Sequence, residues 1–206
     1  MTAGRRGAHT ASPMSAPHTI EQVSPFAFRA ALRNFATGVT VVTTAGPEGP
    51  SAATANAFTT LSLAPPLVLV CLGSGSATLR AIERNGLFAI NVLSADQEWL
   101  ARRFASRNRP RGPASLRDVP HRAGPTGAPL LDGTACWIDC HLAAAHPAGD
   151  HVIAIGRVAG LGETPDLDPL VFHAGRYRAV SDRDVQPAAA PPNLYPFVRS
   201  DLSERR

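Results

Sequence analysis

Apolar residues fall in short runs along most of this chain, and most of these runs suit β-strands. In them, β-branched and apolar residues follow one another without a helical repeat. Such runs predict strands at 39–45, 51–57, 67–72, 87–93, 134–146, 151–161, 169–173 and 176–180. Turn residues at 46–49 and 147–150 each join two neighbouring runs, which predicts two hairpins.

Three segments carry helical signals instead. Each begins at a serine that can act as an N-cap: Ser24 before a helix that ends at Gly38, Ser76 before one that ends at Gly86, and Ser94 before one that carries Trp99 and Phe104. Helices and strands do not alternate regularly. The pattern therefore favours a mainly β (α+β) fold, an antiparallel barrel or sandwich with flanking helices, over a doubly wound sheet.

The chain of 206 residues, 44% of them hydrophobic, is long enough for one domain with its own core. We place this domain at 24–180. Residues 1–23 are small, polar and interrupted by proline, and 181–206 are charged and rich in Pro and Ala, so both are predicted to be tails. Residues 105–128, rich in Arg, Pro and Gly, are predicted to form a long mobile loop.

The basic residues are all of one type: 20 arginines and no lysine. The absence of lysine excludes Schiff-base catalysis, a lysine general base and a lysine-containing phosphate loop. Much of the net charge of +4 is local, because seven arginines lie between Arg102 and Arg122 against the single acid Asp118. A patch of this kind favours a small anionic ligand over a nucleic-acid surface.

Several classes of protein are excluded by what the sequence lacks. No run of 18 apolar residues predicts a membrane span, and the N-terminus has no apolar segment typical of a secretory signal. No G-x-G-x-x-G motif follows a strand, so a dinucleotide would not be held in a Rossmann crevice. Three cysteines are too few for a disulfide framework or a zinc site, and the expected compartment is a reducing cytoplasm.

The histidines and cysteines form no metal-binding motif. His141, His146 and His151 recur every five residues, which matches neither a helix nor a strand, so they are predicted to be exposed or at a hairpin edge. Cys136 and Cys140 face the same side of one predicted strand and are interpreted as buried structural thiols. No metal site is expected.

Three short segments suit a ligand site, and each also has a simpler explanation. Residues 54–58 are small and polar, which lets a flat ligand approach the backbone or makes a tightly packed strand. Ser76 and Thr78 lie at a predicted helix N-terminus, where their hydroxyls could bind an anion or could simply cap the helix. In residues 102–104, the two arginines could bind a phosphate and the phenylalanine could lie beside a ring; the simpler explanation is a solvated charged face. Together they describe a site for a flat heterocycle that carries a phosphate.

The order of these segments resembles the short-chain flavin reductases, the reductase components of two-component flavin-dependent monooxygenases. The matching stretches are FRAALRNFATGVTVVTT (28–44), TANAFTTLSLAPPLVLVCL (54–72), SAT (76–78), GLFAINVLS (86–94), ARRFAS (101–106), GDHVIAIGRV (149–158) and PLVFHAGRY (169–177). The resemblance implies an FMN-binding split β-barrel with Greek-key antiparallel strands. It implies an enzyme that reduces FMN or FAD with NADH or NADPH by hydride transfer and supplies free reduced flavin to a partner monooxygenase.

The resemblance also assigns site residues, because the family holds the flavin in a groove at the interface of a homodimer. The flavin would be bound by Ser51, by Thr54, Ala55, Asn56 and Ala57 along the isoalloxazine edge, by Cys71 and Leu72 beside the ring, by Ser76 and Thr78 at the phosphate, and by Arg103 and Phe104. The nicotinamide nucleotide would be received by His151, which orients it without transferring a proton, and by Phe172, His173, Gly175 and Tyr177.

Ala57 departs from the family pattern, which often has serine there. One hydrogen bond to the ring is therefore expected to be missing, which weakens flavin binding by about 1 kcal/mol. Two rival classes stay open. A non-catalytic flavin-binding or carrier protein of the same fold would bind flavin without oxidising NADH. A nucleic-acid-binding module is disfavoured, because no basic helix carries aromatic residues at regular spacing.

Overall fold

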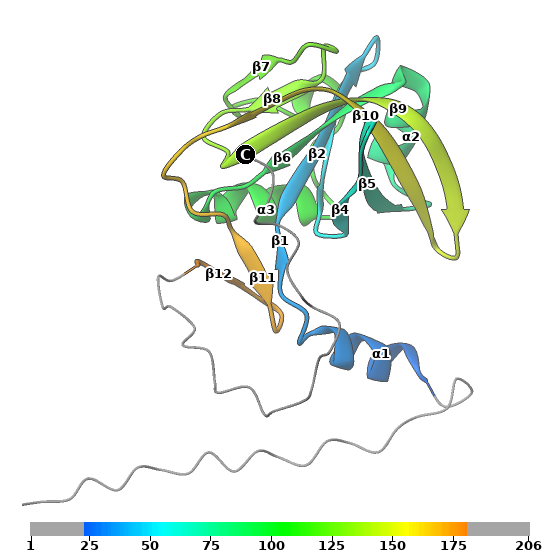
Figure 1. The fold of residues 1–206 in the computed structure, drawn as a ribbon, viewed down its shortest axis with the longest axis vertical. Coiled ribbons are helices and arrows are strands. Elements are labelled where there is room, and N and C mark those ends of the chain that lie inside the picture. Colours follow the sequence, from blue (N-terminus) through cyan, green and yellow to red (C-terminus); the bar gives the residue numbers. More distant parts are fainter. Residues whose placement is uncertain (1–22, 181–206) are drawn as a thin grey trace, which may run out of the picture.

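Two strands of 13 residues each, β9 (Cys136–Ala148) and β10 (His151–Glu163), form a hairpin within the main sheet. In the computed structural model, which describes residues 23–180, this sheet has the strand order β3-β2-β6-β9-β10-β5-β4, and each neighbouring pair is antiparallel (Figure 1). The other elements are α1 (Pro25–Leu32), β1 (Thr37–Gly38), β2 (Thr40–Gly46), β3 (Gly49–Ala55), β4 (Phe58–Leu63), β5 (Pro66–Gly73), α2 (Ala77–Asn85), β6 (Leu87–Val92), α3 (Glu98–Ala105), β7 (His121–Ala123), β8 (Pro129–Leu131), β11 (Val171–His173) and β12 (Arg176–Arg178).

The main sheet closes on itself because its two edge strands are joined directly. β3 and β4 stand at opposite ends of the strand order, yet only Asn56 and Ala57 connect them along the chain. So short a connection spans only about 10 Å, so the two edges have to meet there. The sheet is therefore a split barrel, and the predicted antiparallel barrel with flanking helices is confirmed.

Two apolar clusters hold the helices against this barrel. On one side of the sheet, Ile82 of α2 packs in a cluster with Val42 of β2. On the other side, Phe104 of α3 packs in a cluster with Val41, the neighbouring residue of the same strand. Successive side chains of a strand point to opposite faces, so β2 is buried on both faces, which explains its unbroken run of β-branched residues.

The predicted caps of α2 and α3 are present. Ser76 is the N-cap of α2, and Gly86 ends that helix in the left-handed conformation with φ of 70°. Ser94 and Gln97 form the expected capping box, in which the Ser94 amide donates to Gln97 Oε1 at 3.2 Å. The box opens a 3₁₀ turn at Ala95–Gln97 that leads directly into α3.

The first helix is shorter than predicted. Ser24 caps α1 as expected, but the helix ends at Leu32 and not at Gly38. Thr37 and Gly38 instead form β1, which pairs with β11 from the far end of the domain. The pairing partner lies more than 130 residues away along the chain, so the local pattern at 24–38 gave no signal for it. β1, β11 and β12 form a separate small sheet outside the barrel (Figure 1).

Two further segments differ from the predictions. The run at 51–57 ends as a strand at Ala55, and β4, which begins at Phe58, was not predicted because its residues alternate poorly in polarity. The segment 105–128 includes β7 and a 3₁₀ turn, and its residues Leu116 and Val119 are buried in the cluster that contains α3. These two side chains attach the predicted loop to the core.

The predicted tails at 1–23 and 181–206 lie outside the described residues, apart from Val23. Within residues 23–180, no helix is both long enough and apolar enough to cross a membrane.

Candidate functional site

The connection between β3 and β4 borders a cavity of about 230 Å³. Nine of the residues that the family resemblance assigns line this cavity: Thr54, Ala55, Asn56, Ala57, Cys71, Leu72, Ser76, Phe104 and His151. They come from β3 and its connection to β4, from β5, from the N-cap of α2, from α3 and from the start of β10, which are far apart in the sequence. The fold therefore gathers most of the predicted flavin-binding residues around one cavity.

The backbone at Asn56 and Ala57 belongs to neither neighbouring strand ladder. The register of β2 with β3 ends at the pair Thr40–Ala55, and the register of β4 with β5 begins at Phe58–Val70. The carbonyl of Ala57 accepts a hydrogen bond from the Cys71 amide at 2.9 Å, but no ladder partner occupies the other polar groups of this short segment. Unpaired backbone groups beside small side chains suit the polar edge of a flat heterocycle.

Two threonine hydroxyls hold the end of β3 in place through hydrogen bonds within the protein. Thr54 Oγ1 donates to the carbonyl of Ala101 in α3 at 2.7 Å. Thr40 Oγ1 donates to the carbonyl of Ala55 at 2.7 Å, from the neighbouring strand β2. Both hydroxyl protons are used within the protein, so Thr54 can offer a ligand only its oxygen lone pairs.

The predicted phosphate-binding hydroxyls lie in two different places. Ser76 lines the cavity, and its Oγ accepts a hydrogen bond from the Leu79 amide in the first turn of α2. Thr78 is fully buried, and its hydroxyl lies 3.0 Å from the hydroxyl of Ser51. Neither Thr78 nor Ser51 lines this cavity. The pair instead connects α2 to β3 and thereby positions the helix N-terminus.

Arg109 lines the cavity, and the sequence predictions missed it. The predicted residue Arg103 is directed elsewhere, because its Nη2 donates to the carbonyl of Arg117 at 2.9 Å and approaches that of Ser115 at 3.5 Å. The only signal for Arg109 in the sequence was the concentration of arginines at 102–122, which identifies the patch but not the residue that faces the cavity.

His151 stands at the start of β10, at the open rim of the cavity. It pairs with Gly73 in the register of β10 with β5, and its Nδ1 lies 2.7 Å from Asp150 Oδ1. This hydrogen bond, together with the charge of the imidazole, holds the pKa of Asp150 below its usual value. His141 and His146 are exposed on β9, as predicted for histidines at a hairpin edge. No cluster of three metal-ligating side chains occurs within residues 23–180.

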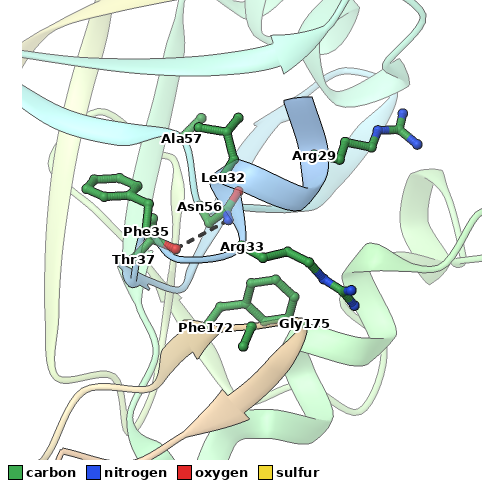
Figure 2. A pocket seen from close by; sticks show the side chains of 10 residues that line it. Arg29, Leu32, Arg33, Phe35, Thr37, Asn56, Ala57, Phe172 and Gly175 are labelled. Atoms are coloured by element: carbon green, nitrogen blue, oxygen red, sulfur yellow. Dashed lines mark hydrogen bonds between the residues drawn. The ribbon is translucent and has the colours of Figure 1, made fainter. Parts of the chain in front are cut away.

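A second cavity, of about 550 Å³, is also bordered by Asn56 and Ala57. Figure 2 shows Phe172 and Gly175 of the β11–β12 hairpin across from α1; Arg29 of this helix and Arg33, just after its end, border the same space. Phe172 and Gly175, which were predicted to receive the nicotinamide, therefore line the second cavity together with Asn56 and Ala57, which also line the first cavity.

Tyr177 and His173 lie next to this second cavity without lining it. The Tyr177 ring packs edge-on against Phe172 with 5.3 Å between centroids, and the guanidinium of Arg102 lies 5.1 Å from the centre of the Tyr177 ring. Burial raises the pKa of the Tyr177 hydroxyl. Both aromatic rings border a smaller cavity of about 270 Å³ together with Thr54 and Asn56.

The two thiols of β9 differ in burial. Cys140 is fully buried, and burial raises its pKa to about 12, with Asp139 adding a like charge. Cys136 is only half-buried, although burial raises its pKa too. The prediction of a buried structural thiol is confirmed for Cys140 and is only partly right for Cys136.

The described residues provide small side chains, unpaired backbone groups, a helix N-terminus and one arginine, but no cluster of acids and bases. Such a site can hold a planar ring with a phosphate, and it offers little for proton transfer. Its chemistry would come from the molecules that it aligns.

Comparisons with known proteins point to one family. A profile of the flavin reductase like domain matches residues 32–181. The reductase subunit of a flavin-dependent monooxygenase from Rhodococcus jostii is 38% identical over 89% of this chain and 92% of its own length. The flavin reductase component of a bacterial two-component tryptophan halogenase has a TM-score of 0.73 at 42% identity, covering 78% of this chain and all 100% of that one. An NADH:FAD oxidoreductase from Streptomyces globisporus, solved with NAD and FAD fragments, has a TM-score of 0.71 at 35% identity and covers 77% of this chain and 94% of its own.

Proposed function

The chain belongs to the flavin reductase-like family, and from that premise we propose that it is an NADH-dependent flavin reductase that supplies reduced flavin to a partner monooxygenase. The observation that carries the proposal is the arrangement at Asn56 and Ala57. These two residues border both a cavity suited to a flat ring and a second cavity lined by aromatic and basic side chains.

Hydride transfer between a nicotinamide and a flavin requires alignment more than side-chain chemistry. The donor carbon has to lie within roughly 3–3.5 Å of the accepting nitrogen with the two rings face to face. Two adjoining cavities that share a wall of small residues suit this geometry. Backbone amides at 54–57 would stabilise the negative charge that grows on the reduced ring.

The flavin is a substrate in this proposal. It would lie along Thr54–Ala57 with its ring beside Cys71 and Leu72 and with its phosphate toward Ser76. The missing hydroxyl at Ala57 fits an enzyme that releases its product, since each absent hydrogen bond lowers affinity by about 1 kcal/mol. The nicotinamide nucleotide would enter from the side of Phe172 and Gly175, with His151 at the rim orienting it.

The active form would be a homodimer, because α1 carries an uncovered apolar surface. Phe26 of this helix is 84% exposed and Phe35, just after it, is 71% exposed. Leu63, at the end of the edge strand β4, is 90% exposed. Exposed aromatic residues beside a substrate cavity are typical of a protein interface, and we assign the occupant as a second copy of this chain.

The test is direct. The purified protein is mixed with NADH and either FMN or FAD, and the loss of reduced nicotinamide absorbance is followed, with NADPH compared under the same conditions. Oxidation of NADH that depends on added flavin supports the reductase. Flavin binding without oxidation of either nucleotide would identify a flavin carrier instead, and the absence of both would overturn the proposal.

A further inference from the structure

Arg109 is held by two hydrogen bonds to backbone carbonyls. Its Nε donates to the carbonyl of Ala52 in β3 at 3.0 Å, and its Nη1 donates to the carbonyl of Ser106 at 3.1 Å. These bonds fix the plane of the guanidinium at the cavity wall. Among residues 23–180, the Nη2 group has no hydrogen-bond acceptor, so its donors stay available to a ligand.

The charge of Arg109 is not neutralised by the protein residues that the structure describes. The ion pairs within residues 23–180 are Arg84–Glu48, Arg102–Glu98 and His151–Asp150, so Arg109 has no carboxylate partner there. Burial lowers the pKa of Arg109, and the like charge of Arg111 lowers it further. A half-buried cation beside a like charge is stabilised when an anion binds next to it.

The same cavity also presents the N-terminus of α2. Ser76 uses its hydroxyl oxygen and its carbonyl to accept from the amides of Leu79 and Arg80. The first amides of a helix have no intrahelical acceptor, so those of Ala77 and Thr78 are left for an external one. A rigid arginine and a helix N-terminus that meet at one cavity form an anion site of mixed origin.

From this arrangement we infer that Arg109 binds the ribityl 5′-phosphate of the flavin, an assignment that rests on the proposed reductase function. The phosphate would lie between the Arg109 guanidinium and the start of α2, while the ring extends along Asn56 and Ala57 toward the second cavity. Arg109 would thereby set the preference for phosphorylated flavins over riboflavin.

The experiment compares FMN with riboflavin, which has the same ring and ribityl chain but no phosphate. Arg109→Gln should raise the KM for FMN and its dissociation constant by about tenfold to hundredfold, because a charge-assisted hydrogen bond is lost. The KM for riboflavin and the kcat should stay within about twofold of wild type. Arg107→Gln is the matched control, since Arg107 is an exposed arginine of the same segment that lines none of the cavities, and it should change neither KM.

Two other outcomes overturn the assignment, and a third separates it from the proposed reductase function. An equal loss of affinity for FMN and riboflavin in Arg109→Gln would show that Arg109 only shapes the cavity through its bonds to Ala52 and Ser106. A phosphate-selective loss in Arg103→Gln, with Arg109→Gln unchanged, would move the role to Arg103. If the wild-type protein binds FMN more tightly than riboflavin but reduces neither, the reductase function fails while the phosphate site stands. Thermal unfolding of each variant confirms that it is folded.

Discussion

The side-chain amide of Asn56 donates a hydrogen bond to the hydroxyl of Thr37 across 3.3 Å (Figure 2). Thr37 in turn lies opposite Phe172 in the pairing of β1 with β11. The contact therefore connects the split of the barrel to the small sheet that carries the proposed nicotinamide residues. Asn56 also borders each of the three cavities described above, which places it where the two substrates would meet.

Replacing this side chain should affect both substrates together. We expect Asn56→Ala to raise the KM for flavin and for NADH by about fivefold each, because one net hydrogen bond contributes about 1 kcal/mol. The melting temperature should change little, since the bond from Asn56 to Thr37 is exposed. Asn34→Ala is the control: Asn34 makes a similar exposed bond to the Ala31 carbonyl at 3.2 Å, and its side chain lines none of the three cavities described above. A change in melting temperature without a change in either KM would contradict the prediction.

His151 should act on the nicotinamide nucleotide more than on the flavin. Its side chain is 50% exposed at the rim and is oriented by Asp150, so it can reach a second substrate that covers the flavin ring. His151→Ala is expected to raise the KM for NADH by about tenfold, the effect of one hydrogen bond to a charged or polar group. The dissociation constant for flavin, measured by fluorescence quenching, should stay near wild type. His146→Ala, an exposed histidine on β9, serves as the control, and equal losses of both affinities in His151→Ala would contradict separate roles.

Restoring the family's serine at position 57 should strengthen flavin binding. Ala57 is exposed and borders the cavities on both sides of the split, so an added hydroxyl has room and can reach a ring atom. We expect Ala57→Ser to lower the flavin dissociation constant by about fivefold, the effect of about 1 kcal/mol. Slower release of reduced flavin should accompany this change and lower kcat in stopped-flow assays. Ala57→Val, which adds volume without a hydroxyl, should weaken binding instead, and equal effects of the two substitutions would contradict a hydrogen bond.

The sequence predicted those parts of the fold whose signals are local. The cap residues Ser24, Ser76 and Gly86 mark helix boundaries through backbone groups within four residues, and all three act as predicted. The strand at 39–45 was recognisable because burial on both faces requires an unbroken run of β-branched side chains. The end of α1 was wrong, because it depends on pairing with β11, whose position only the folded chain determines.

The same distinction between local signals and contacts made only in the folded chain applies to the candidate site. Family motifs located the segment 54–57 and the cavity around it, since these positions are defined by backbone shape and small residues. They could not distinguish Arg103 from Arg109, because both lie in one basic segment and differ only in the carbonyl groups that their guanidinium groups contact. The inward orientation of Thr78 toward Ser51 was likewise invisible, since a helix cap and a ligand contact use the same residue types.

The proposed dimer makes α1 the element to test. Phe26 is 84% exposed and borders none of the cavities, so Phe26→Glu changes the apolar surface without altering the substrate sites directly. Burying a phenylalanine contributes about 1.5–3 kcal/mol, and a symmetric dimer loses this contribution twice. We expect the dimer dissociation constant to rise by at least about a hundredfold, measured by sedimentation. Leu161→Glu, at a side chain of β10 that is 69% exposed, should leave the dimer intact, and a Phe26→Glu protein that remains dimeric would exclude this surface as the interface.

The buried thiol of Cys140 should make the protein less stable in alkali. Burial raises its pKa to about 12 in the folded protein, whereas an unfolded cysteine ionises near pH 8.5. Above that pH the unfolded chain releases a proton that the folded chain keeps, so this contribution to stability is complete below about pH 8.5 and is lost as the pH rises toward 12. The free energy of unfolding should fall by up to about 1.4 kcal/mol per pH unit from this thiol alone between about pH 9 and 11.

Urea unfolding across this pH range measures the effect. Cys140→Ala leaves a cavity beside Phe88 and should be less stable at every pH, but its free energy of unfolding should decline less steeply with pH than that of the wild type. The comparison uses slopes, so the loss of packing does not obscure it. Parallel curves for the two proteins would mean that the Cys140 thiol ionises equally in the folded and unfolded chains. They would contradict the burial that assigns this residue a structural role separate from the flavin site.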